Sequence, residues 1–386
     1  MMRTSLAMKT ILIGSFWCGL LALPFMGWFS SGILIAVLIA VGIFFRAILA
    51  VTGTSNNVFP AKAGIQNLFE KLDSRLSGND KSKVFRSAST VIGVVSLLVV
   101  PLFLNNYYLD ILTLALLYAL LAVGLNVAVG LTGLLDLGYA GFYGIGAYTY
   151  ALLSTRLGIP FWLGVPFGGI VAASFGFLLG VITLRLRGDY LAIVTLGFVQ
   201  IVYLVLNNWD TVTHGPNGIL QIGRPTLGSF LLHQPIHFYY LALFFLAATV
   251  FIIYRLTQSQ IGRALCAIRE DGIAAEAMGI DTTRMKILAF SLGAGIAGVA
   301  GVFFAAKYTF VSPESFNFFE SVRILTMVVL GGMGSLFGAI LGAFLLTFLP
   351  EMLRGLDLYR MLIFGATLVL MMIVRPQGLL GNKNAI

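Results

Sequence analysis

The stretch 330–344, LGGMGSLFGAILGAF, places five glycines inside one of the most apolar segments of the chain. In a water-soluble helix, each of these glycines would cost about 1 kcal/mol relative to alanine. In lipid, small residues spaced four apart let two helices approach closely, and Gly334, Gly338 and Gly342 have this spacing. The pair Gly331–Gly332 precedes them and can interrupt the helix. The stretch therefore indicates a membrane segment that is broken and closely packed.

The composition of the whole chain agrees with a lipid environment. Of its 386 residues, 59% are hydrophobic and only 10% are charged, which is too little charge to cover a water-soluble surface. Runs long enough to cross a hydrocarbon layer of ~30 Å lie at 10–30, 32–51, 87–104, 108–130, 139–156, 160–184, 189–207, 237–256, 287–308, 322–348 and 358–375. The sequence predicts an all-α polytopic membrane protein with about 10–11 transmembrane segments, one of them broken or re-entrant.

A polar interruption at 52–86 divides the chain. It separates an N-terminal two-helix hairpin, predicted at 1–51, from a membrane core predicted at 87–386. Within this interruption, apolar residues recur at helical spacing from Ile65 to Leu76, as in a helix that lies on a membrane surface. A solvated cytoplasmic linker explains the same residues equally well.

Lysine and arginine predict the orientation, because they collect on the cytoplasmic side of membrane proteins. A cytoplasmic N-terminus, with 322–348 entering and leaving on the outer side, places most of the basic residues in the cytoplasm. A single kinked span is the alternative for 322–348. The middles of the spans carry almost no charge, and Arg323 falls on the outer side in this arrangement.

The residue pattern argues against several classes of function. Its 3 histidines and 2 cysteines form no cluster with acids, so we assign no catalytic residues and no metal ligands. The basic residues lie between apolar runs rather than on one face, so no nucleic-acid partner is indicated. No glycine is followed by lysine, so the chain lacks an ATP-binding P-loop. The GAGIAG match at Gly293–Gly298 to a dinucleotide fingerprint lies in an apolar span, where helix packing explains it.

Glycine-rich apolar segments at 130–146 and 330–344 point to a transport pathway, because broken membrane helices in both halves of a chain often line one. Packing alone is the alternative. Asp136 lies in the first segment, and we favour a helix cap over a carboxylate that couples an ion. The residues assigned to the translocation path or its packing are Gly133, Asp136, Gly331, Gly332, Gly334, Gly338 and Gly342.

The loop at 257–284 carries a short amphipathic pattern between two spans. Ile261, Leu265 and Ile268 share one helical face, and an alanine-rich stretch continues the helix until Gly279 can end it. Since the loop offers this apolar face no partner, we predict that it docks in a groove of another protein. A solvated connector is the alternative.

Several longer motifs resemble one family. The loop sequence IGRALCAIREDGIAAEAMGID (261–281) resembles the cytoplasmic coupling loop of ABC importer permeases, whose helix docks on an ATPase subunit. Further motifs look like those of the LivM-type permeases for branched-chain amino acids: RLRGDYLAIVTLGF (185–198), HGPNGI (214–219), VSPESFNFFES (311–321), VVLGGMGSLFGAILG (328–342) and RPQGLL (375–380). The resemblance runs from about Ala122 to Leu380.

The resemblance implies a division of labour in the bacterial cytoplasmic membrane. Such a permease pairs with a second, similar permease, while two cytoplasmic ATPase subunits bind ATP and Mg²⁺ and an external binding protein delivers the substrate. The chain itself would then carry no cofactor and catalyse no reaction. The coupling role of the family's loop, carried over to the matching residues of this chain, implies that the following residues couple it to the ATPase: Ile268, Arg269, Glu270, Asp271, Ala274, Glu276, Ala277, Gly279 and Asp281.

Three alternatives remain open at this point. A permease for urea or short-chain amides shares the architecture, since selectivity rests largely with the external binding protein. An ion-coupled secondary carrier is disfavoured by the apolar middles of the spans. A channel is disfavoured because the sequence shows no charged or repeated filter.

Overall fold

The computed structural model describes residues 100–183, 189–227, 230–352, 365, 369 and 378–379. The chain forms two compact units, 1–104 and 105–386, and the described part of the first is a short 3₁₀ helix, η1 (Val100–Phe103), with Leu104 after it. The predicted hairpin at 1–51, the linker at 52–86 and nearly all of the run at 358–375 lie outside the described residues.

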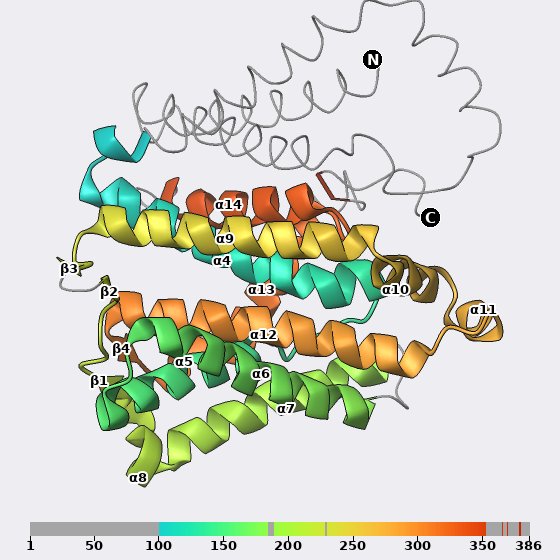
Figure 1. Ribbon diagram of the computed structural model, residues 1–386, viewed down its shortest axis with the longest axis horizontal. Coiled ribbons are helices and arrows are strands. Elements are labelled where there is room, and N and C mark those ends of the chain that lie inside the picture. Colours follow the sequence, from blue (N-terminus) through green and yellow to red (C-terminus); the bar gives the residue numbers. More distant parts are fainter. Residues whose placement is uncertain are drawn as a thin grey trace, which may run out of the picture. The chain divides into compact units, whose positions relative to one another are not determined.

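The second unit is a bundle of long helices (Figure 1). Within the described residues, five helices are long and apolar enough to cross a membrane: α4 (Asn106–Thr132), α6 (Phe161–Thr183), α7 (Asp189–Asn208), α9 (Pro235–Gln258) and α12 (Thr282–Tyr308). A sixth helix, α5 (Tyr139–Leu157), occupies the predicted run at 139–156. These bounds confirm the all-α membrane fold. The most apolar stretch of α4 is 89% buried, against 22% for α7, so α4 lies at the centre of the unit.

Glycines hold α12 against α5 and α6. A Cβ atom at Gly298 would lie 2.5 Å from the carbonyl oxygen of Gly168 on α6. A Cβ atom at Gly301 would overlap the carbonyl oxygen of Tyr143 on α5. Only glycine permits backbones to approach this closely, which confirms helix packing as the role of the GAGIAG stretch.

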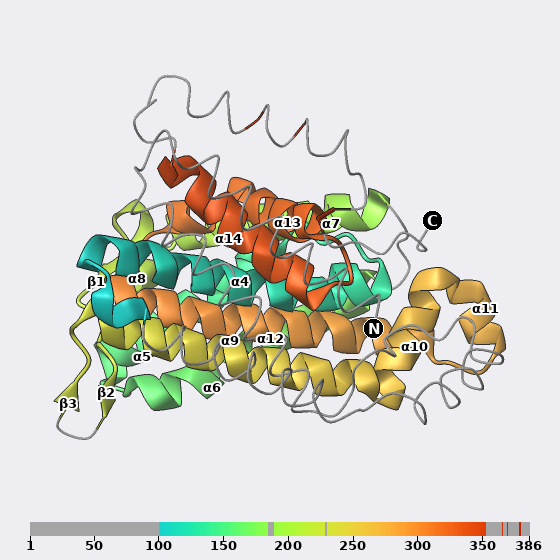
Figure 2. The ribbon, with the colours of Figure 1, turned by 90° about the horizontal axis from the view of Figure 1, so that it is seen from above.

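The two ends of the bundle differ in structure (Figures 1 and 2). At one end, the strand end, β1 (Ile219–Leu220) pairs antiparallel with β4 (Phe310–Val311), and β2 (Thr226–Leu227) pairs with β3 (Phe230–Leu231). The short helices there are α8 (Asp210–Thr213), η2 (Gly215–Asn217) and η3 (Pro313–Phe316). At the opposite end, α10 (Gln260–Glu270) and α11 (Gly272–Ala277) project beyond the long helices.

The stretch at 322–348 forms two helices, α13 (Phe318–Gly331) and α14 (Leu336–Met352). Their contacts run antiparallel: a Cβ atom at Gly331 would overlap the carbonyl of Gly338, and one at Gly342 would overlap the carbonyl of Met327. The chain reverses at Gly332 and Gly334, whose φ angles of 112° and 83° favour glycine. The segment is therefore a hairpin with both ends on one side, which confirms the re-entrant alternative over a single kinked span.

Candidate translocation and coupling site

The chain from Gly133 to Gly138 turns back into the bundle without forming a helix. Gly133 ends α4 with a φ of 72°, and the Tyr139 hydroxyl at the start of α5 donates to the Gly293 carbonyl oxygen at 3.1 Å. Gly293 lies three turns into α12, about 16 Å from the N-terminal end of that helix at 1.5 Å per residue. Irregular backbone at this depth is tolerated only where protein or water surrounds it.

Side chains from distant motifs satisfy the backbone of this non-helical stretch and of the first turn of α5. The Leu137 N–H donates to Thr195 Oγ1 of α7 at 3.0 Å, and the Ala140 N–H donates to Ser321 Oγ of α13 at 2.9 Å. Thr195 and Ser321 belong to the motifs at 185–198 and 311–321. The structure thus joins two motifs to the glycine-rich segment at 130–146, which sequence reasoning alone leaves apart.

Asp136 is buried in the same stretch, but it is not the cap of α5. Gly138 occupies the cap position and makes no side-chain cap bond. Instead, Asp136 Oδ1 accepts a hydrogen bond from the Gly138 N–H at 2.8 Å, which is an Asx-turn. The helix-cap prediction is corrected in this respect, because the carboxylate shapes the turn that precedes the helix.

Replacement of Asp136 by Asn should keep most of the transport activity, since the amide oxygen can accept the same bond from Gly138. Replacement by Ala should lower activity further, because it leaves a buried N–H without its partner at a cost of about 1–3 kcal/mol. Substrate uptake at matched membrane levels measures both variants. Loss of uptake in both variants alike, with ATP hydrolysis intact, would instead favour an ion-coupling carboxylate.

The break between α13 and α14 meets the end of α4. The Gly334 N–H donates to Asn126 Oδ1 at 2.9 Å, and the Leu379 N–H donates to the Leu330 carbonyl oxygen at 2.9 Å. The motifs at 328–342 and 375–380 therefore meet beside α4. The five predicted path glycines of this segment separate into two groups, because Gly332 and Gly334 make the turn. The others, Gly331, Gly338 and Gly342, pack α13 against α14.

Arg269 connects the loop end of the bundle to this break. Its Nη1 atom donates to the Gly130 carbonyl oxygen at 2.8 Å, and a Cβ atom at Gly334 would lie 2.6 Å from Nη1. The guanidinium thus satisfies a carbonyl near the end of α4, where helix carbonyls lack intrahelical partners. Sequence reasoning assigns Arg269 to a contact with an ATPase, whereas the structure places its guanidinium within this chain.

The apolar face of α10 is covered by the chain itself. Leu265 and Ile268 are buried, because α10 packs against α4, α9 and α12. The prediction that this face docks in another protein is therefore wrong, and Ile268 is a core residue. The error arises because the loop sequence does not show that the long helices cover the face.

Three members of the predicted coupling set shape the loop. Asp271 Oδ1 accepts from the Ile273 and Ala274 N–H groups at 2.8 and 3.1 Å, which caps α11. Asp281 accepts from the Arg284 N–H at 3.0 Å and caps α12. Gly279, with a φ of 85°, reverses the chain after α11 as C-terminal glycines do. These three residues hold α11 in place.

An apolar surface remains exposed on α11. Ile273 is 67% and Met278 83% exposed, and Ala274, Glu276 and Ala277 are exposed with them. We call Ile273, Ala274, Ala277 and Met278 the α11 face. Sequence reasoning missed Ile273 and Met278, although Ile273 lies four residues before Ala277 and Met278 four residues after Ala274, which is the spacing of neighbours on a helix surface.

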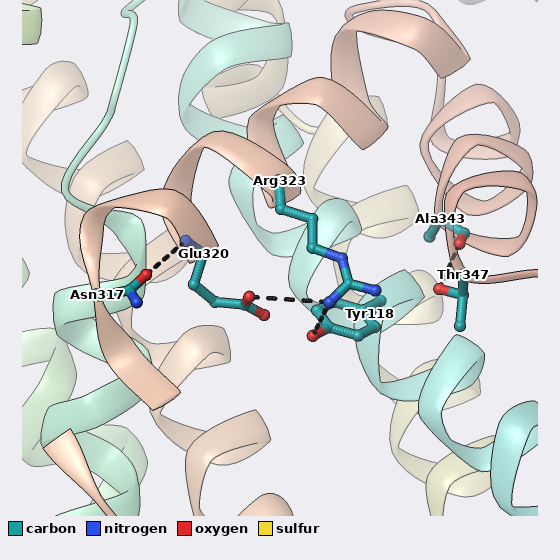
Figure 3. Close-up of polar contacts among 6 residues, drawn as sticks. All are labelled: Tyr118, Asn317, Glu320, Arg323, Ala343 and Thr347. Atoms are coloured by element: carbon teal, nitrogen blue, oxygen red, sulfur yellow. Dashed lines mark hydrogen bonds and ion pairs between the residues drawn. The ribbon is translucent and has the colours of Figure 1, made fainter. Parts of the chain in front are cut away.

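A charged pair lies deeper in the bundle than the sequence predicts. Arg323, assigned to the outer side, donates from Nη1 to the Tyr118 hydroxyl at 2.9 Å, and Tyr118 lies midway along α4. Glu320 lies 3.9 Å from Arg323 (Figure 3). Arg323 therefore lies deeper than its predicted place at the outer end of a span, because it contacts the middle of α4.

Comparisons with known proteins agree with the motifs. The family described as branched-chain amino acid transport system / permease component matches residues 107–372. The high-affinity branched-chain amino acid transport system permease protein LivM of Salmonella typhimurium is 47% identical over 323 residues, which is 78% of this chain and 75% of the relative. LivM of Escherichia coli has the same identity and coverage. No solved structure matches the chain.

A second group of relatives is more distant. The high-affinity branched-chain amino acid transport system permease protein LivH of Escherichia coli is 30% identical over 292 residues, covering 70% of this chain and 93% of the relative. The matched residues include the non-helical stretch, the loop with α10 and α11, and the hairpin of α13 and α14. The chain therefore belongs to the permease family of branched-chain amino acid transport systems.

Proposed function

We propose that this chain is a membrane permease subunit of an ATP-driven importer for branched-chain amino acids. The observation that carries the proposal is the 47% identity to LivM permeases over most of both chains. The non-helical stretch at 133–138 and the broken hairpin of α13 and α14 are consistent with it, because such features line transport pathways.

The proposal assigns the energy source to other chains. The α11 face would dock on a cytoplasmic ATPase subunit that binds ATP and Mg²⁺, which places the α10–α11 end in the cytoplasm. The distribution of lysine and arginine along the sequence would place the N-terminus there as well. Arg269 would carry movement of the loop to the break, since its guanidinium contacts Gly130 and lies beside Gly334. The path would open and close when α13 and α14 move relative to α4.

A second permease would complete the path. LivM and LivH are both relatives of this chain, which favours a pair of similar but different permeases over two identical copies. The sides of α6 and α7 that are exposed in this chain, with Phe167, Ile170 and Ile201 among their residues, face either the second permease or lipid. An external binding protein would deliver the substrate to the strand end.

Uptake into vesicles that hold the complete importer tests this function. We expect leucine uptake to require ATP and the external binding protein, to persist when a protonophore collapses the ion gradient, and to be inhibited by isoleucine and valine. Strong inhibition by urea or acetamide would favour the amide-importer alternative. Uptake driven by an ion gradient without ATP would overturn the proposal in favour of a secondary carrier.

A further inference from the structure

A glutamate and an arginine face each other halfway through the bundle. Tyr118, which contacts the arginine, is the thirteenth of the 27 residues of α4, so it lies about 20 Å from either end of the helix at 1.5 Å per residue. A charged side chain at the centre of a bilayer is costly, and those found there commonly line a substrate pathway. The charged pair of Glu320 and Arg323 therefore requires an explanation.

The pair is only partly satisfied by the protein. Arg323 Nη1 lies 3.9 Å from Glu320 Oε2, which is too long for a hydrogen bond. The same atom donates to the Tyr118 hydroxyl at 2.9 Å, and the guanidinium carbon lies 4.4 Å from the centre of the Tyr118 ring. A guanidinium has five N–H donors. In the part of the chain that the structure describes, its contacts with oxygen atoms are through Nη1.

Both charged groups are held in place and partly accessible. Asn317 Oδ1 accepts from the Glu320 N–H at 3.1 Å and caps α13 (Figure 3), which fixes Glu320 in the first turn. The Arg323 side chain is 34% and that of Glu320 18% exposed. Glu320 and Arg323 make no direct hydrogen bond, but the Tyr118 hydroxyl bridges them, since it accepts from Arg323 and bonds to Glu320. If the role of the pair were structural alone, it would be expected to be closed from solvent at this depth.

An aromatic cluster precedes the pair along the chain. The Phe316 ring, one residue before the cap of α13, lies 5.0 Å from the ring of Tyr143 and 5.7 Å from that of Phe304. Tyr143 lies on α5, whose Ala140 N–H donates to the hydroxyl of Ser321, the residue after Glu320, at 2.9 Å. The cluster offers apolar surface next to the two charges, which is the combination that an amino acid with an aliphatic side chain requires.

We propose that Arg323 and Glu320 bind the carboxylate and the ammonium group of a zwitterionic amino acid as it crosses the membrane. The proposal deepens the proposed function and rests on it. An amino acid carries its two opposite charges on groups bonded to the same carbon, so it can bridge Glu320 and Arg323 and form hydrogen bonds with both. A ligand with one charge would pair with one of the residues and be repelled by the other.

Binding of leucine and of two analogues tests the assignment. The purified membrane complex, with its second permease and ATPases, is placed in nanodiscs without the external binding protein. Radiolabelled leucine is competed with leucinamide, which lacks the carboxylate, and with 4-methylpentanoate, which lacks the ammonium group. We expect Arg323→Gln to weaken the binding of leucine by about 10- to 100-fold, the value of one hydrogen bond to a charged group. The same variant should leave the binding of leucinamide unchanged or improved.

The matching variant reverses the pattern. Glu320→Gln should weaken the binding of leucine and of leucinamide, which both carry the ammonium group. It should leave the binding of 4-methylpentanoate unchanged or improved. Arg323→Lys keeps the charge but loses the planar fork, so it should give a smaller loss of leucine affinity than Arg323→Gln. Thr347→Val is the control, because the Thr347 hydroxyl donates within its own helix to Ala343 at 2.7 Å (Figure 3) and should not affect binding.

Several outcomes would overturn the site. These are the absence of leucine binding to the wild-type complex, an Arg323→Gln affinity within about twofold of wild type, or an equal loss for leucine and leucinamide. Failure of Arg323→Gln, Arg323→Lys and Glu320→Gln to assemble would assign the pair to folding and would also overturn it. The proposed function fails separately, if the complete wild-type importer shows no ATP-dependent leucine uptake.

Discussion

Replacement of Ala277 by arginine should abolish co-purification of the ATPase subunits while the chain still reaches the membrane. Ala277 is exposed at the end of α11, and Ile273, four residues before it, and Met278, directly after it, are exposed as well. If the α11 face seats in a groove, the arginine brings an unpaired charge into a desolvated contact. Such a charge costs about 3–5 kcal/mol, which weakens assembly by at least about a hundredfold.

The measurement compares the ATPase subunits recovered with the tagged chain and the hydrolysis that substrate stimulates. Gln260→Arg is the matched control, since Gln260 is exposed at the other end of the same loop and lies outside the α11 face. We expect the control to assemble normally. Normal recovery of ATPases with Ala277→Arg would show that the α11 face is not the docking surface.

Replacement of Gly338 by leucine should prevent the hairpin of α13 and α14 from closing. A Cβ atom at Gly338 would overlap the backbone carbonyl of Gly331, and a backbone atom cannot move aside as a flexible side chain can. Overpacking of a core typically costs about 1–3 kcal/mol, and we expect this variant at the upper end of that range or beyond it. Even Gly338→Ala should be destabilising, because alanine already carries the overlapping atom.

The readout is the thermal stability of the purified chain and its uptake activity. Gly197→Ala on α7 is the control, because a Cβ atom there would have no neighbour within 4 Å. In a helix, this exchange should be neutral or stabilising by up to about 1 kcal/mol. An unchanged melting temperature for Gly338→Leu would contradict the close contact between Gly331 and Gly338.

Much of the membrane architecture follows from local sequence. Long apolar runs predicted α4, α5, α6, α7, α9 and α12, because the length and hydropathy of a span are properties of about 20 consecutive residues. Glycine spacing predicted the break and the close contact in 322–348, since only glycine adopts the φ angles of Gly332 and Gly334 without strain. Alanines followed by Gly279 likewise predicted α11 and its end.

The candidate sites could not be predicted to the same degree, because their contacts join distant residues. Thr195 accepts from Leu137 across 58 positions, and Arg323 reaches Tyr118 across 205. Ile268 illustrates the same limit. Its face of α10 has no partner within the loop, but the long helices α4, α9 and α12 cover it. Periodicity shows that a face must be covered, but it does not show by what.

The sequence by itself determined that this chain is an α-helical membrane permease with a broken hairpin and a helical loop between two spans. Only the tertiary structure decided which helix lies at the centre, which loop residues stay exposed, and that Arg323 lies halfway through the bundle. The physical reason is the solvent. Lipid is as apolar as a protein core, so a helix that faces lipid needs the same apolar residues as a helix inside the bundle. Both α4 and α6 are strongly apolar, yet the most apolar stretch is 89% buried in α4 and 28% buried in α6. In lipid, burial is set by packing rather than by hydropathy.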